Sequence, residues 1–253
     1  MSTLETTENA DGLALAYHHT EGKSAHVVFL GGFMSDMSGS KATFLEQQVT
    51  AQGYGYTRFD YRGHGESDGR FVEATIGKWL SDVLHILDEI VKVPTILVGS
   101  SMGGWMMLLA ALARPQQVQG LVGIAAAPDF TVRLMWEKMT EAQRHTLIEE
   151  GLLQVPSEYG FEPYHITKDL IEESRQHLLL DDEIAIECPV RLLHGMRDPD
   201  VPWEFSPLVA QKLATQDVQV TLVKDGDHRL SEPEDLQRLQ QTVLSLCAAV
   251  EKP

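Results

Sequence analysis

The chain has 253 residues, of which 43% are hydrophobic and 23% are charged, so it can form one globular α/β domain with a large core. Its formal net charge of −17 repels phosphate backbones and anionic lipid headgroups, which excludes nucleic acid as a partner and a basic membrane anchor. No apolar run reaches the ~18 residues of a membrane span, and residues 1–5 lack the pattern of a secretory signal, so we expect a cytoplasmic protein.

Short apolar runs alternate along the chain with stretches of helical period. Strands are predicted at residues 13–18, 26–30, 54–60, 95–98, 121–125, 190–193 and 218–223. Helices are predicted at residues 41–52, 79–91, 101–113 and 233–250. This alternation predicts a mostly parallel sheet with helices on both faces, and ligands of such sheets bind at the carboxyl ends of the strands.

Residues 129–187 interrupt the alternation, because they show no convincing strand pattern. Their apolar side chains are spread among many charges, which favours helices inserted between two strands. We therefore expect a single domain over residues 1–253 that carries a small helical cap at 129–187, above the active edge of the sheet. Part of this insertion is also expected to be the crossover helix that joins the two flanking strands.

The central motif is Gly99-Ser100-Ser101-Met102-Gly103, which joins an apolar strand to a helix of strong helix formers. A Gly-x-Ser-x-Gly sequence in this strand–turn–helix context is the nucleophile elbow of α/β-hydrolases. Only Ser101 lies two residues from each glycine, so Ser101 rather than Ser100 is the predicted nucleophile. The sharp turn projects its hydroxyl, and the helix N-terminus favours the negative charge that develops beside it.

A serine nucleophile needs a base, and that base needs an acid to orient it. His228 follows the last predicted strand and precedes the final helix, and Asp198 follows the preceding strand, with Asp200 as the alternative acid. The chain order Ser101, Asp198, His228 is the order expected for this fold. His194 is expected to pack at the end of its strand. The remaining carboxylates of the two loops are predicted to cap loop backbone: Asp225 and Asp227.

An oxyanion hole needs two N–H donors. One is predicted to be the N–H of Met102, directly after the nucleophile, and the other the N–H of Phe33 in the glycine-containing loop after an early strand. Residues 59–69 form another strand-to-loop segment, but they lack a Gly-x-x-x-x-Gly-Lys pattern, so we reject nucleotide binding. Their predicted role is to brace the elbow from below.

Apolar side chains are expected to line an acyl pocket, and the residues proposed for it are Met34, Phe130, Trp136, Met139 and Trp203. The chain has two cysteines, Cys188 and Cys247, which are too few for a disulfide framework and are predicted to be core thiols. No set of His, Cys or carboxylate residues has metal-ligand spacing, so we expect no metal and no cofactor.

Five segments together resemble the α/β-hydrolase superfamily over the chain from about His26 to the C-terminus: Gly31-Gly32-Phe33, Asp60-Tyr61-Arg62-Gly63-His64-Gly65, Gly99 to Gly103, His194-Gly195-Met196-Arg197-Asp198 and Asp227-His228. Residues 39–42, 58–61, 77–79, 98–105 and 188–196 are further similar to a subgroup of mitochondrial palmitoyl-protein thioesterases that also cleave acyl glucuronides. Gly31 departs from that subgroup, which usually has proline there. The resemblance implies hydrolysis of acyl thioesters or esters beneath a small helical cap.

The leading hypothesis is a serine hydrolase that cleaves carboxylic esters or acyl thioesters through an acyl-enzyme on Ser101, with His228 as general base and Asp198 as orienting acid. Its substrate is expected to be a small molecule or an acyl group. A carbon–carbon bond hydrolase or a perhydrolase would use the same triad. A non-catalytic binding protein on this fold is the third hypothesis, and the intact triad argues against it.

Overall fold

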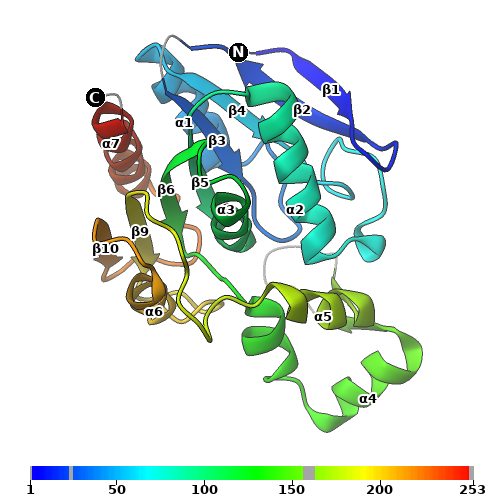
Figure 1. The fold of residues 1–253 in the computed structure, drawn as a ribbon. Coiled ribbons are helices and arrows are strands. Elements are labelled where there is room, and N and C mark those ends of the chain that lie inside the picture. The colour runs from blue at the N-terminus through cyan, green and yellow to red at the C-terminus, as the bar shows by residue number, and fades with distance from the viewer. Residues whose placement is uncertain (1, 23–24, 156–162, 251–253) are drawn as a thin grey trace.

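The structure, a computed structural model, describes residues 2–22, 25–155 and 163–250. Its middle layer is a sheet of eight strands (Figure 1). The strands are β1 (Leu4–Glu8), β2 (Ala14–Thr20), β3 (His26–Leu30), β4 (Gly55–Phe59), β5 (Thr95–Ser100), β6 (Val118–Ile124), β9 (Val190–Gly195) and β10 (Val218–Val223). Their spatial order is β1-β2-β4-β3-β5-β6-β9-β10. From β4 to β10 the neighbours are parallel, whereas β2 is antiparallel to both of its neighbours.

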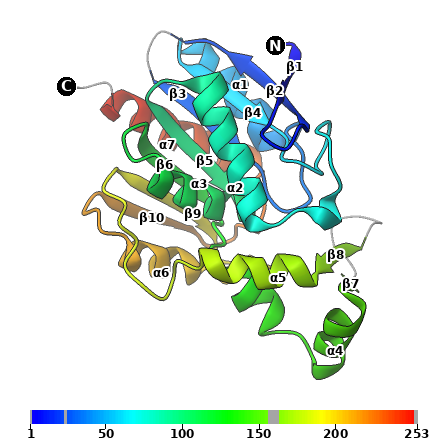
Figure 2. The ribbon, with the colours of Figure 1, turned by 45° about the vertical axis from the view of Figure 1, so that its right-hand side comes forward.

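Helices cover both faces of the sheet, as the alternating pattern predicts (Figure 2). They are α1 (Ser40–Ala51), α2 (Ile76–His85), α3 (Met102–Ala113), α4 (Glu141–Glu150), α5 (Lys168–Ser174), α6 (Phe205–Lys212) and α7 (Pro233–Val250). One face packs against α1 and α7, and the other against α2, α3 and α6. The predicted α/β class is therefore confirmed.

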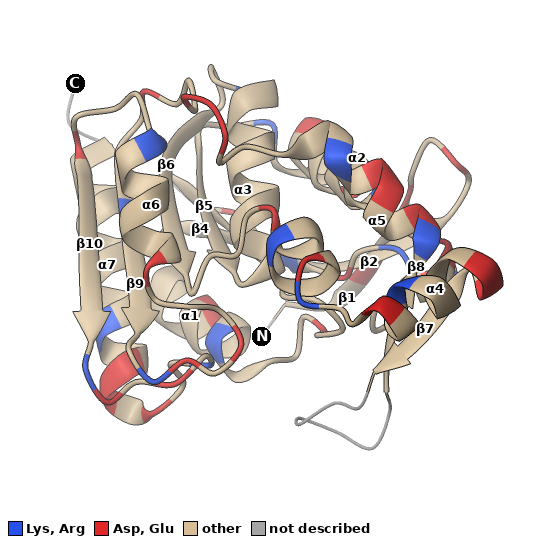
Figure 3. Cartoon of the chain, turned by 90° about the horizontal axis from the view of Figure 1, so that it is seen from below, with Lys and Arg blue, Asp and Glu red and all other residues tan. Residues whose placement is uncertain are grey.

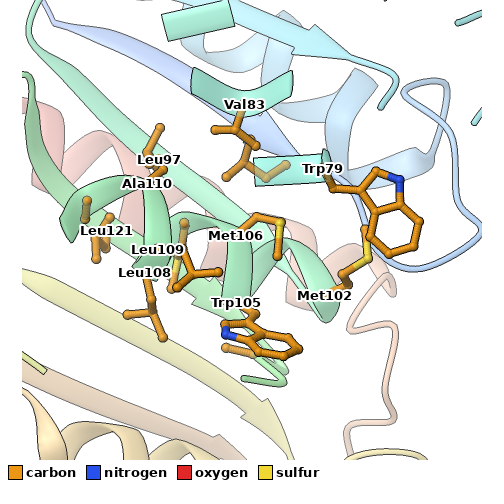
Figure 4. Close-up of a cluster of buried hydrophobic side chains, with 14 of the residues drawn as sticks. Trp79, Val83, Leu97, Met102, Trp105, Met106, Leu108, Leu109, Ala110 and Leu121 are labelled. Carbon is orange, nitrogen blue, oxygen red and sulfur yellow. The ribbon is translucent and has the colours of Figure 1, made fainter. Parts of the chain in front are cut away.

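The larger apolar core lies between the sheet and the helices α2 and α3 (Figure 4). Trp79 of α2 and Trp105 and Met106 of α3 are fully buried there, together with Leu97 of β5. Each fully buried side chain of this size contributes about 2 kcal/mol or more through removal of apolar surface from water. The helix that begins at the elbow is thus held rigidly on the sheet.

The insert, defined as residues 129–187, differs from its prediction. It contains α4 and α5, but also a two-stranded antiparallel sheet of β7 (Leu152–Val155) and β8 (Tyr164–Thr167). The expectation of a purely helical insertion without strands is therefore wrong. Each strand has four residues, which gives too few alternations of apolar and polar residues for a period-two pattern to stand out.

The first residue of the insert is joined to Leu179 and Leu180 by one buried carboxylate. Asp129, at the start of the insert, has a φ of 61° and a fully buried side chain. Its oxygens accept hydrogen bonds from the N–H groups of Leu179 and Leu180, both at 2.9 Å. Arg133, which lies 3.5 Å from the Asp129 carboxylate, also contacts Asp181. The start of the insert is consequently fastened to residues near its end.

The helix α5 fastens the insert to the body of the fold. The Glu173 carboxylate accepts the N–H of Gly77, in the first turn of α2, at 3.1 Å and 3.2 Å from its two oxygens. A carboxylate at this place is favoured by the positive end of the helix dipole. The Trp105 indole N–H donates to the His177 carbonyl at 3.1 Å. This part of the insert therefore has fixed contacts with α2 and α3.

Charged residues are distributed over the side of the molecule that carries the insert (Figure 3). Acidic positions lie on α4 and α5 and in the loops after β9 and β10, with basic positions among them.

In the described part of the chain, no helix combines the length and hydropathy needed to span a bilayer. Cys247 is a buried residue of α7, and burial raises the pKa of the half-buried Cys188 thiol to about 11, as expected for core thiols.

A buried ion pair links α2 to the segment after β4. The Arg62 guanidinium and the Asp82 carboxylate are 2.7 Å apart, with side chains 6% and 0% exposed. Asp82 also accepts the N–H of Arg62 at 2.9 Å and the side-chain amide of Asn9 at 3.0 Å. Loss of one partner from such a pair leaves a buried charge without compensation.

We expect Asp82→Ala to lower the free energy of unfolding by about 3–5 kcal/mol, because the buried Arg62 charge then keeps only its ion pair with the exposed Asp11 carboxylate. Urea denaturation measures this value. Asp88→Ala is the matched control, since Asp88 pairs with Arg114 at the surface, where both side chains are more than a third exposed. That variant should lose less than about 1 kcal/mol. Equal losses in the two variants would contradict the importance assigned to the buried pair.

Candidate active site

Ser101 lies in the turn between β5 and α3 and has the left-handed backbone angles φ 55° and ψ −116°. The turn requires glycine on both sides. A Cβ atom at Gly99 would lie 2.2 Å from the Gly103 carbonyl oxygen, and one at Gly103 would lie 2.1 Å from the Leu30 carbonyl oxygen. Strand, helix and the end of β3 therefore approach one another closely at the predicted nucleophile.

Asp198 and His228 are joined directly. The Nδ1 atom of His228 lies 2.7 Å from Oδ2 of Asp198, and the carboxylate is fully buried whereas the imidazole is 16% exposed. Because a carboxylate only accepts hydrogen bonds, Nδ1 carries the proton and Nε2 is left as the basic nitrogen. Asp198 rather than Asp200 is thus the acid that contacts the histidine.

Further donors surround the Asp198 carboxylate. Its Oδ1 accepts the N–H groups of Asp200 and Val201, both at 2.8 Å, and His194 Nε2 lies 3.2 Å from Oδ2. Burial alone would raise the pKa of Asp198, but the hydrogen bonds from His194 and His228 outweigh it and hold that pKa well below its ordinary value. The carboxylate therefore stays ionised in a buried position.

The loops that carry Asp198 and His228 meet where β9 ends. A Cβ atom at Gly195 would lie 2.3 Å from the Gly226 carbonyl oxygen, so glycine allows the two loops to touch. Asp227 accepts the N–H of Leu230 at 2.9 Å, which confirms its predicted capping role. Asp225 was also predicted to cap loop backbone, but its exposed side chain instead forms an ion pair with Arg197 at 2.6 Å.

The loop after β3 passes beside the elbow. A Cβ atom at Gly32 would lie 3.4 Å from the Cβ of Ser101, so the backbone of this loop borders the serine. Met34 has a φ of 56°, and its N–H donates to Nε2 of His64 at 3.2 Å. Phe33 follows Gly32 and precedes Met34 in this loop, and it lines the same cavity as Ser101.

Residues 59–69 hold the loop after β3 rather than the elbow itself. Asp60 accepts the N–H of Met37 at 2.7 Å, and the Tyr61 hydroxyl donates to the Gly31 carbonyl at 3.4 Å. His64 adds the contact with Met34. The expectation that this segment braces the elbow from below is corrected: its buried polar groups face the neighbouring loop because β4 lies next to β3.

A cavity of about 670 Å³ contains both Ser101 and His228 in its wall. In the described part of the chain no hydrogen bond joins the two side chains, and such contacts often tighten only when substrate is bound. The aromatic and aliphatic wall combines the loop after β3 with the insert: Phe33, Met34, Phe130, Leu134, Met135 and Tyr164. Hydroxyl and charged side chains line the remainder, among them Ser35, Asp36, Ser38, Ser40, Lys41, Asp200, Arg229 and Ser231.

The predicted pocket residues divide into two groups. Met34 and Phe130 line the cavity, whereas Trp136, Met139 and Trp203 lie outside its wall. Met139 packs with the apolar residues of the insert itself, and the Trp136 ring lies under two guanidinium groups, those of Arg144 and Arg175. Trp203 forms part of the turn before α6. An apolar residue of a small insert can pack in the insert's own core or line the cavity. The sequence pattern does not distinguish these two roles.

Sequence reasoning missed three lining residues of the insert: Leu134, Met135 and Tyr164. The Tyr164 ring lies 6.0 Å from that of Phe33, which also contacts Phe71, Trp79 and Phe130. The signal for Tyr164 was its place in a short alternating run, β8, which was not recognised as a strand. Phe33 was predicted for its N–H alone, and its side chain also joins the insert to the body.

One group of acidic and imidazole side chains is close enough to surround a cation: Asp198, Asp200 and His228 have ligand atoms within 4.8 Å of one another. Both oxygens of Asp198 are already hydrogen-bonded to N–H donors. This arrangement suits a carboxylate that accepts hydrogen bonds and orients an imidazole.

Comparisons with known proteins identify the family and the fold of this chain. The family described as serine aminopeptidase S33 matches residues 22–158. The bovine protein named palmitoyl-protein thioesterase ABHD10, mitochondrial, is 45% identical over 90% of this chain and 75% of its own length. Among solved structures, mouse alpha/beta hydrolase domain-containing protein 10 has a TM-score of 0.91 at 40% identity, and the match covers 99% of this chain and 100% of the mouse chain. A putative hydrolase from Agrobacterium vitis S4 has a TM-score of 0.93 at 37% identity, with 98% of each chain covered.

The parallel sheet, the elbow and these matches define the class: the chain is an α/β hydrolase, and hence an enzyme. Within that class it belongs to the serine aminopeptidase S33 family. The expectation of a cytoplasmic protein is wrong, because relatives at 43% to 45% identity are named as mitochondrial. That expectation used the lack of a secretory signal and of an apolar span, and neither feature distinguishes the cytoplasm from an organelle.

We expect His64 to make stability depend on pH. Burial lowers the pKa of His64 from 6.5 to about 4 in the folded protein. The unfolded chain therefore binds this proton first, and the stability present above pH 6.5 is lost as the pH falls toward 4. Between pH 7 and pH 5 the loss through His64 is about 2 kcal/mol. Protonation also removes the acceptor of the Met34 N–H.

Urea denaturation of the native chain and of His64→Gln at pH 7 and pH 5 measures this contribution. The variant should lose about 2 kcal/mol less than the native chain over that interval, because glutamine does not titrate. Other buried groups, such as His26, contribute equally to both proteins and cancel in the difference. The same pH dependence in both proteins would show that His64 does not titrate in this range.

Proposed function

We propose that this enzyme hydrolyses carboxylic esters or acyl thioesters through a covalent acyl-enzyme on Ser101. The observation that carries the proposal is that Ser101, on its left-handed turn, shares one cavity with the hydrogen-bonded pair His228–Asp198. A nucleophile, a base and an orienting acid on separate loops of one sheet edge are what acyl transfer requires. Relatives named as thioesterase and lipase support this reaction class.

In the proposed reaction, His228 Nε2 takes the Ser101 proton while Oγ attacks the acyl carbon. The tetrahedral intermediate collapses when the protonated imidazole gives that proton to the leaving alkoxide or thiolate. Water then enters, and His228 removes one of its protons while the water oxygen attacks the acyl carbon. The protonated imidazole returns this proton to Ser101 Oγ as the acyl–oxygen bond breaks, which releases the carboxylic acid and restores Ser101 and neutral His228. Asp198 remains ionised throughout, stabilising the imidazolium and holding its tautomer.

The negative charge on the carbonyl oxygen is proposed to rest on the N–H groups of Phe33 and Met102. Met102 is the first residue of α3, so its N–H has no partner within the helix and lies at the positive end of the helix dipole. Phe33 belongs to the loop that borders Ser101 and is held on its far side by His64 and Asp60. A fixed loop keeps the donor in place before charge develops.

The insert is proposed to act as a cap that shapes the acyl side of the site within a single domain of residues 1–253. Phe130, Leu134 and Met135 come from its first segment and Tyr164 from β8, and all four face the cavity beside Phe33. These side chains favour an apolar acyl group, and the volume of about 670 Å³ is in the range of small-molecule sites. The hydroxyl-lined portion would receive the leaving group.

Ser101→Ala is expected to abolish turnover of p-nitrophenyl esters and acyl thioesters, by at least about a thousandfold, while the fold persists. Mass spectrometry after reaction with a fluorophosphonate probe should locate the label on Ser101. Ser100→Ala is the matched control, because Ser100 is the neighbouring hydroxyl and lies in the last position of β5. Turnover that survives in Ser101→Ala, or a label on another residue, would refute the proposed nucleophile.

Leu134→Trp is expected to reduce kcat/KM for an octanoyl thioester by about tenfold and for an acetyl thioester by less than about threefold, because a larger ring occupies the acyl side of the cavity. A chain-length series of thioesters measures the ratio. Trp136→Phe is the control, since Trp136 lies in the insert but outside the cavity wall. An equal effect of Leu134→Trp on both chain lengths would place the acyl group elsewhere.

A further inference from the structure

A fully buried histidine lies behind the Asp198 carboxylate. His194 is the penultimate residue of β9, and its side chain is 0% exposed. Its Nε2 lies 3.2 Å from Oδ2 of Asp198 and 3.1 Å from the Val201 carbonyl oxygen, and its Nδ1 lies 2.7 Å from the Ser206 hydroxyl. Both edges of the ring are thus engaged, one with the acid of the active site and one with α6.

The neighbours of His194 determine where its proton lies. Asp198 Oδ2 and the Val201 carbonyl are both acceptors, so Nε2 must carry a proton and donate to them. The Ser206 hydroxyl can then donate to Nδ1, which leaves the ring neutral. The resulting order is Ser206 to His194 to Asp198, and the same Oδ2 atom accepts from His228 Nδ1 at 2.7 Å.

We infer that His194 is a positioning residue for the hydrolytic reaction, which fixes Asp198 by donating a hydrogen bond to the oxygen that orients His228. The inference rests on the proposed function of Ser101, Asp198 and His228. Two donors converge on Oδ2, and two backbone N–H groups hold Oδ1. The carboxylate can therefore rotate only if several hydrogen bonds break together.

His194 also sets how much negative charge Asp198 presents to His228. A hydrogen bond to Oδ2 from behind withdraws part of that charge. Without it, the carboxylate stabilises the protonated His228 ring more strongly, so the base becomes available only at higher pH. Asp200 is a charged group near this pair, with its carboxylate within 4.8 Å of both. Further acidic and basic side chains line the same cavity as His228: Asp36, Lys41 and Arg229. Substitution of His194 changes none of them. Ser206 is the polar contact on the α6 side and carries no charge.

The test compares His194→Gln with His194→Asn. The amide nitrogen of glutamine reaches the position of Nε2 and can donate to Asp198, whereas the asparagine amide reaches only the position of Nδ1, near Ser206. We expect the asparagine variant to lose about tenfold to a hundredfold in kcat at nearly constant KM, and its kcat/KM profile to move to higher pH. The glutamine variant should recover most of the rate and the native profile.

A third substitution, His26→Gln, controls for the loss of a buried imidazole. His26 is 3% exposed, lies at the start of β3 and hydrogen-bonds to Thr57 at 2.7 Å. It should lower Tm without moving the pH profile. Circular dichroism and fluorophosphonate labelling of Ser101 are recorded for every variant, so that a failure to fold is distinguished from a slower reaction.

Native kcat and pH profile in both His194 variants would overturn the inference and leave the proposed function intact. Equal losses in the two variants, with an unshifted profile, would also overturn it, because a structural role alone predicts that result. If the asparagine variant does not fold, His194→Leu replaces it, because leucine is also unable to donate to Asp198: a native kcat and profile in that variant overturns the inference, and a slower reaction with a profile at higher pH supports it. Absence of labelling at Ser101 in the native chain would instead overturn the proposed function.

Discussion

The site depends on one steric constraint, the close approach of three backbone segments at the elbow. Gly99 and Gly103 leave no space for a Cβ atom, because the carbonyl oxygens of Gly103 and Leu30 would lie 2.2 Å and 2.1 Å from it. The end of β3, the end of β5 and the start of α3 are thereby held in mutual contact. Ser101 takes its left-handed geometry from this contact, and the loop after β3 is brought beside it.

Charge at the site is controlled by hydrogen-bond donors rather than by solvent. Asp198 is buried and still ionised, since N–H groups from its own loop and two imidazoles converge on its oxygens. In the loop after β4 the buried acceptor is neutral instead of charged, because burial keeps His64 unprotonated and its ring accepts the N–H of Met34. Both arrangements fix a loop and a protonation state together, which keeps the site organised before substrate arrives.

The sequence allowed the sheet, the elbow and the positions of Asp198 and His228 to be predicted, because long apolar runs and glycines at strand ends follow directly from packing. The hairpin of β7 and β8 was not predicted, since strands this short give a weak pattern. The pocket was predicted only in part: Phe130 lines it, but Met139 fills the core of the insert. His194 was assigned to packing, and only the distances to Asp198 and Ser206 reveal its hydrogen bonds.

The hydrogen bonds that Asp129 accepts within the insert have a consequence for how such proteins diverge. Because this one carboxylate binds the N–H groups of Leu179 and Leu180, the chain that leaves β6 at Asp129 comes back beside Asp129 at Leu179, before it crosses to the start of β9. The chain between these residues can then lengthen, shorten or exchange its hairpin by mutation without altering the spacing of β6 and β9. Under the proposed function, substrate preference can therefore change in descendants of this chain through the inserted segment, while the proposed catalytic residues at the sheet edge stay unaltered.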